Sequence, residues 1–70
     1  MRYAIVLEKT EHNYSAYVPD LPGCVATGAN LQETENLIRE AIKFHIEGLL
    51  EDGLPLPEPT SVVEYMDVAA

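Results

Sequence analysis

The chain has 70 residues, 4 of them basic and 12 acidic, for a formal net charge of −8. One domain of this size buries only about 60% of the surface of its unfolded chain, so it usually needs a disulfide, a metal or association for stability. The single cysteine excludes an intrachain disulfide, and His12 and His45 lack the spacing of metal ligands. The negative charge disfavours binding to the phosphate backbone of a nucleic acid. It suits binding to a basic partner, or it serves only solubility.

A β-hairpin is predicted at the N-terminus. Arg2–Lys9 carries apolar side chains on both faces, which is typical of a central strand covered on both sides. Tyr14–Val18 alternates as a second strand. Because the four residues between them are polar, we expect a short turn and antiparallel pairing.

The next segment predicts a rigid turn followed by a third strand. The turn consists of Pro19, Asp20, Leu21, Pro22 and Gly23. Its two prolines cannot donate to a strand ladder, and its glycine permits a positive φ. The third strand is expected over Cys24–Thr27 and ends at Gly28, with Cys24 as a small buried side chain.

One long amphipathic helix is expected after these strands. Asn30 is a good N-cap, Glu33 completes a capping box, and the helix should run to about Asp52, with Gly53 as the C′ residue. His45 lies on its apolar stripe, and Gly48 is expected to let the helix approach the sheet or a neighbouring helix closely.

A final strand is predicted over Thr60–Val68, after the proline-rich and therefore extended residues 54–59. The chain is then a single α+β domain over residues 1–70 with the order β-β-β-α-β. Right-handed crossover favours the sheet order 3-2-1-4 with the helix on one face. The other face needs a second copy or a partner protein, so we expect a homo-oligomer, either a dimer or a tetramer.

No catalytic, metal or cofactor site is expected. The acidic residues on predicted strands or turns are Glu8, Glu64 and Asp20, and no nucleophile with a base accompanies them. The N-terminus lacks a signal-peptide core, and no apolar run approaches the roughly 18 residues of a membrane span. We therefore expect a cytoplasmic, non-enzymatic protein that binds neither membranes nor nucleic acid directly.

Two stretches of the sequence resemble the HicB family of antitoxins. The first is the run from Tyr17 to Cys24, Y-V-P-D-L-P-G-C, and the second is the helix exit E-G-L-L-E-D-G-L-P-L-P from Glu47 to Pro57. The resemblance covers about residues 3 to 66. It implies a partial RNase-H-like fold without the acidic metal centre, and a small basic toxin partner that cleaves mRNA. It also implies that the chain covers the toxin's catalytic and RNA-binding surface.

Many members of that family carry a C-terminal DNA-binding domain, and we expect none in this short stand-alone form. The alternative interpretation is a homo-oligomeric domain of the same fold that binds another protein or a small ligand. An enzyme is the third, and Asp20→Ala would test it. Partner contacts are expected from the uncovered sheet face and the last strand, at Glu8, Tyr17, Val62, Glu64 and Tyr65.

Overall fold

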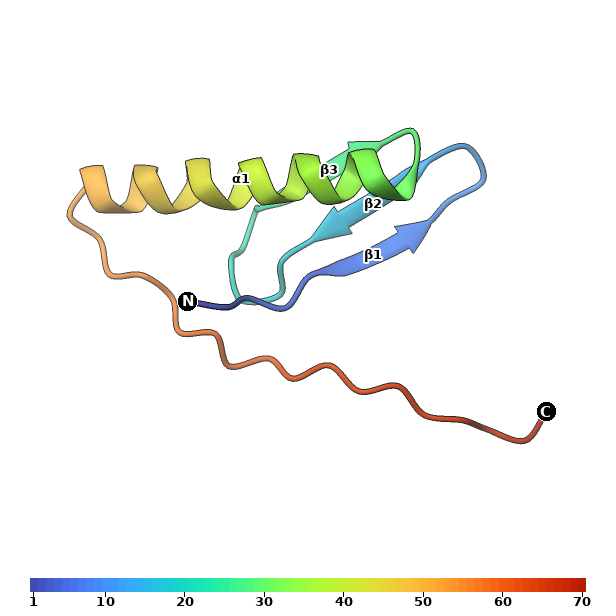
Figure 1. The fold of residues 1–70 in the computed structure, drawn as a ribbon. Helices are drawn as coiled ribbons and strands as arrows, with labels where there is room; N and C mark the ends of the chain where they lie inside the picture. Colours follow the sequence, from blue (N-terminus) through green and yellow to red (C-terminus); the bar gives the residue numbers. More distant parts are fainter.

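Three antiparallel strands and one long helix make up the structure, a computed structural model that describes residues 1–70 (Figure 1). The strands are β1 (Val6–Lys9), β2 (Tyr14–Tyr17) and β3 (Val25–Gly28), and the helix is α1 (Leu31–Glu51). The sheet has the order β1-β2-β3, and α1 packs across one face, mainly against β3 and then against β2. The predicted α+β class, with three strands before the helix, is confirmed.

The strand register decides which side chains face α1. Leu7, Ala16 and Ala26 are partners in the register, and all three belong to the core beneath the helix. Side chains alternate along a strand, so the neighbouring positions point away from the helix. We call this second surface the open face; its residues are Val6, Glu8, Ser15, Tyr17, Val25 and Thr27.

The core is small and lies where β2, the turn after it and α1 meet. Only five apolar side chains are buried: Ala16, Val18, Leu21, Cys24 and Ile38. Seven partly buried side chains pack around them, among them Tyr3 and Ile5 ahead of β1. A core of this size is typical of chains that gain further stability by association.

β3 and the first turn of α1 approach each other closely at Gly28. A Cβ placed on Gly28 would lie 2.5 Å from Thr34 Oγ1 and 2.9 Å from the Thr34 backbone nitrogen. Thr34 is fully buried there, and its hydroxyl donates to the Asn30 carbonyl at 2.7 Å. The close contact between strand and helix therefore requires a glycine at this position.

Both ends of α1 are capped by the residues that the sequence predicts. Asn30 accepts a hydrogen bond from the Glu33 backbone N–H at 2.8 Å, and the Glu33 carboxylate accepts from the Ala29 N–H. At the other end Gly53 has a φ of 69°, and the Leu54 N–H donates to the Leu49 carbonyl at 2.9 Å. This is the bonding pattern of a Schellman motif, which needs the left-handed residue at its C′ position.

All three strands are shorter or shifted relative to the prediction, and β2 ends at Tyr17 rather than Val18. β1 begins at Val6 rather than Arg2, because its partner β2 ends at Tyr17 and Pro19 has no N–H to continue the ladder. β3 begins at Val25 rather than Cys24, whose N–H donates instead to the Leu21 carbonyl in the turn, at 3.0 Å.

The predicted fourth strand over Thr60–Val68 is wrong for the single chain. No strand follows α1, and the place beside β1 in the expected order 3-2-1-4 is unfilled. The C-terminal residues instead run past the N-terminus and away from the sheet (Figure 1). Hydrogen bonds from Tyr3 to Pro57 and from Thr60 and Ser61 to Asp20 hold the start of this segment and fix its course.

Candidate functional site

The open face of the sheet is an uncovered, mixed apolar and acidic surface. Val6, Tyr17 and Val25 form one row across the three strands, and Glu8, Ser15 and Thr27 form the next. Tyr17 is 42% exposed and Val25 is 64% exposed, although both belong to strands of the sheet. Large apolar side chains at this exposure, beside a carboxylate, are suited to contact with another macromolecule.

Of the five residues predicted to contact a partner, the structure brings two together. Glu8 and Tyr17 lie on adjacent strands of the open face, one register row apart. Val62, Glu64 and Tyr65 are exposed on the C-terminal segment and do not lie on the sheet. Val25 was not among the predicted contacts, because its place beside Tyr17 depends on the register of β3.

The turn between β2 and β3 is built from two consecutive tight turns. The Leu21 N–H donates to the Val18 carbonyl at 3.1 Å, and the Cys24 N–H donates to the Leu21 carbonyl at 3.0 Å. Each turn has a proline at its second position, and Gly23 supplies the positive φ of 82° that the second turn needs. Leu21 and Cys24 then point into the core, where both are buried.

Asp20, in the first of these turns, holds the start of the C-terminal segment. Its carboxylate accepts from the Ser61 backbone N–H at 2.9 Å, from the Ser61 hydroxyl at 2.9 Å and from the Thr60 hydroxyl at 3.2 Å. The Ser61 N–H bond is the main reason why the pKa of the Asp20 carboxyl falls below its ordinary value of 3.8. Asp20 therefore connects two parts of the chain that are 41 positions apart.

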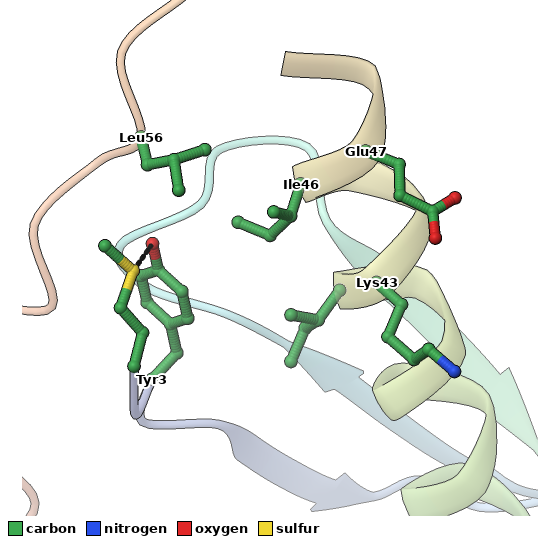
Figure 2. Close-up of a pocket in the computed structure, with 7 residues that line it drawn as sticks. Tyr3, Lys43, Ile46, Glu47 and Leu56 are labelled. Carbon is green, nitrogen blue, oxygen red and sulfur yellow. Dashed lines mark hydrogen bonds between the residues drawn. The ribbon is translucent and has the colours of Figure 1, made fainter. Parts of the chain in front are cut away.

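A groove separates the N-terminal segment from the second half of α1 (Figure 2). It holds about 480 Å³, and most of its lining is apolar. Tyr3 and Leu56 line one side, and Ile46 faces them from the helix, with Lys43 and Glu47 also contributed by α1 (Figure 2). The Tyr3 hydroxyl donates to the Pro57 carbonyl at 2.6 Å and lies 3.3 Å from the Met1 sulfur. The groove suits an apolar group and offers no paired nucleophile and base.

The residues predicted for helix packing have different surroundings. His45 is half-buried on α1. A Cβ placed on Gly48 meets no atom within 4 Å, so the approach of the helix to the sheet does not depend on this glycine. Close approach of a neighbouring helix at Gly48 stays a prediction. Phe44, one turn earlier, is 79% exposed.

The possible metal-ligating side chains are dispersed, and the one thiol is buried. No group of three or more His, Cys, Asp or Glu side chains is placed to hold a metal ion. Burial raises the pKa of the Cys24 thiol above its ordinary value of 9.0, so this cysteine is protonated and weakly nucleophilic at neutral pH. The structure also contains no helix with the length and apolar character that crossing a membrane requires.

Comparison with known proteins gives a consistent result. The family model described as HicB_like antitoxin of bacterial toxin-antitoxin system matches residues 3–69. A 14.9 kDa protein of Haemophilus phage HP1 is 43% identical over 67 residues, which are 96% of this chain and 50% of the phage protein. The chain thus spans about half the length of that relative. A UPF0150 protein of Helicobacter pylori is 38% identical over 91% of this chain and 90% of its own length.

A solved structure with a similar fold comes from a toxin-antitoxin complex. The chain matches one from the HicA3 and HicB3 toxin-antitoxin complex with a TM-score of 0.72 and 35% sequence identity. The match covers 86% of this chain and 70% of the other.

Proposed function

This chain belongs to the HicB-like antitoxin family, and we propose that it neutralises a small basic HicA-like toxin that cleaves mRNA. It would do so as a non-catalytic binding module that covers the toxin's catalytic and RNA-binding surface. The observation that most supports this proposal is the likeness to a chain of the HicA3 and HicB3 complex at 35% identity.

The open face is the surface that we assign to the toxin. It is the side of the sheet that α1 leaves uncovered, and it presents Tyr17 and Val25 side by side. Exposed tyrosine is enriched at protein interfaces, because its ring buries a large apolar area while its hydroxyl keeps a hydrogen bond.

Charge favours a basic partner for this chain. The net charge of −8 attracts a protein that binds RNA through basic residues, and it repels RNA itself. Glu8 carries this charge onto the open face, beside the apolar row. We accordingly assign the chain to the cytoplasm, where such a toxin meets mRNA, and assign it no direct contact with nucleic acid.

The proposal is tested by co-purifying the tagged chain with the short basic protein encoded beside it and then assaying mRNA cleavage. A stoichiometric complex that cannot cleave mRNA is the expected result. If cleavage continues in a stoichiometric complex, the chain binds the toxin without covering its active surface, and the mechanism is wrong. Absence of any complex would favour the alternative, a domain of the same fold that binds another protein or a small ligand.

Two substitutions on the open face sharpen this test. Tyr17→Ala removes an exposed aromatic side chain and is expected to weaken toxin binding by about thirtyfold, the effect of a central interface residue. Glu8→Lys is expected to slow association, most strongly at low salt. Glu40→Lys is the matched control, because it makes the same change in net charge on the exposed surface of α1. Equal effects of both charge reversals would place the toxin elsewhere than on the open face.

A further inference from the structure

The C-terminal segment, residues 61–68, is an apolar stretch that the single chain leaves largely exposed. Tyr65 is 94% exposed and Met66 is 84% exposed, and Val62, Val63 and Val68 are also exposed. β-branched and aromatic residues at this density are typical of a strand. Five large apolar side chains in one extended run are also more than a soluble chain usually leaves in water.

One edge of the sheet, at β1, has no strand paired with it. β1 is an edge strand, because the order is β1-β2-β3 and only β2 pairs with it. One row of its backbone N–H and C=O groups is therefore without a strand partner, and such an edge is a template for another strand. No strand or helix of the chain lies beside this edge.

The chain's own C-terminal segment is held away from that edge. Asp20 fixes Ser61 beside the turn that follows β2. Tyr3 fixes Pro57, which lies four residues before Ser61 in the chain. A groove of about 320 Å³ then lies between residues 2–4 and the segment, lined by Arg2, Tyr3, Ala4, Ser61 and Val63. Beyond this groove the segment diverges from β1 (Figure 1).

The connection between the helix and the segment is proline-rich and extended. Three prolines, Pro55, Pro57 and Pro59, alternate along it and favour an extended backbone. This extended connection directs a strand-forming segment away from the sheet of its own chain. Exchange of an identical element between two copies is then a low-cost route to a dimer.

We propose that two copies of this chain exchange their C-terminal segments, so that residues 61–68 of each copy pair with the free β1 edge of the other. The exchange gives each segment a backbone partner, covers both β1 edges and buries the exposed apolar side chains. It also enlarges a core that has only five buried apolar residues in the single chain.

The exchange has a consequence for the open face that rests on the proposed function. A strand added to β1 widens both surfaces of the sheet, so the second copy would contribute side chains beside Glu8. Residues of the C-terminal segment, such as Glu64 and Tyr65, would then reach the toxin-binding surface of the other copy. The dimer itself is measured without toxin, so its failure and the failure of toxin binding are separate results.

Sedimentation velocity of the full chain across a wide range of concentration tests the exchange. The wild-type chain is expected to form a dimer with twice the mass of the 7.7 kDa monomer. Tyr65→Pro removes a backbone donor in the middle of the segment, and it is expected to leave a folded monomer because Tyr65 touches little of the fold. Circular dichroism of this variant checks that α1 is intact.

Phe44→Asp is the matched control, since it removes another highly exposed aromatic side chain, this time from α1. Its dimer is expected to persist. A wild-type chain that stays monomeric, or a Tyr65→Pro dimer as stable as the wild type, would overturn the proposal. So would a dimer that only Phe44→Asp dissociates, because the helices would then form the contact.

Isotope-filtered NMR on a mixture of labelled and unlabelled chains separates exchange from other dimers. Contacts between the β1 amides of one copy and the Val62 and Val63 methyl groups of the other are expected. Contacts found only within one chain, or only between the two C-terminal segments, would rule out the exchange of strands onto β1.

Discussion

Residues 3–53 and residues 54–70 are held in place in different ways. The first region has three strands, a capped helix and every buried apolar side chain of the chain. The second region contains no helix or strand, and the hydrogen bonds of Tyr3 and Asp20 attach it to the first. Yet the second region is as rich in strand-forming residues as β1 itself.

This difference shows that strand propensity does not by itself create a strand. A strand needs a neighbour, and the neighbour must be within reach of a backbone whose course other contacts have set. In this chain Asp20 and the alternating prolines set that course away from β1. Within the single chain the second region is therefore held mainly by these hydrogen bonds, whereas the first region has its own apolar core.

The largest expected effect is a loss of stability on substitution of a buried side chain in the first region, compared with an exposed one in the second. Ile38→Ala creates a cavity in the small core and is expected to lower the free energy of unfolding by about 3 kcal/mol. Tyr65→Ala in the second region is expected to change it by less than about 0.5 kcal/mol in dilute solution, where chains are monomeric. Urea titration of both variants measures the two values. Similar losses in dilute solution would mean that the second region packs on the first within one chain.

A smaller change in stability is expected on substitution of two glycines in the first region, one in a crowded position and one in open space. Gly28→Ala forces a methyl group against the Thr34 backbone and is expected to cost about 2 kcal/mol. Gly48→Ala places its methyl group in open space within a helix, so it is expected to raise stability by about 0.5 to 1 kcal/mol. Thermal unfolding of the two variants gives opposite shifts in Tm. A loss of stability on Gly48→Ala would indicate a contact with another chain at this position.

The sequence predicts features that depend on residues close together in the chain and on the regular spacing of apolar residues. The N-cap at Asn30, the C′ glycine at Gly53 and the hairpin between β1 and β2 follow from short motifs, and the structure has all three. The start of β1 at Val6 was not predicted, although the signal was present, because Pro19 ends the ladder on the opposite strand.

Contacts between distant positions are what the sequence does not predict. The hydrogen bonds that Thr60 and Ser61 donate to Asp20 join residues 40 and 41 positions apart, and no local pattern marks such a pairing. The same limit applies to the candidate site. Glu8 and Tyr17 share a face because one hairpin register places them there, whereas Val62, Glu64 and Tyr65 were expected on a strand that the single chain does not form.

The smallest expected effect concerns the bond between the two regions, and it depends on pH. The folded pKa of Asp20 lies below 3.8, so the contribution of its carboxylate to stability is present above that value and disappears as the pH falls through the folded pKa. NMR titration of the Asp20 carboxyl measures this directly. Ser61→Pro removes the backbone N–H that lowers the pKa most, and the pKa is expected to rise toward 3.8.

Ser61→Ala is the companion variant, because it removes the hydroxyl and keeps the backbone N–H. A smaller rise in the pKa of Asp20 is expected, since the hydroxyl lowers that pKa less than the N–H does. If neither variant moves the titration, Asp20 does not hold the second region in solution. Only the proline-rich connection would then keep the C-terminal segment from its own β1 edge, so pairing within one chain would compete with exchange between copies.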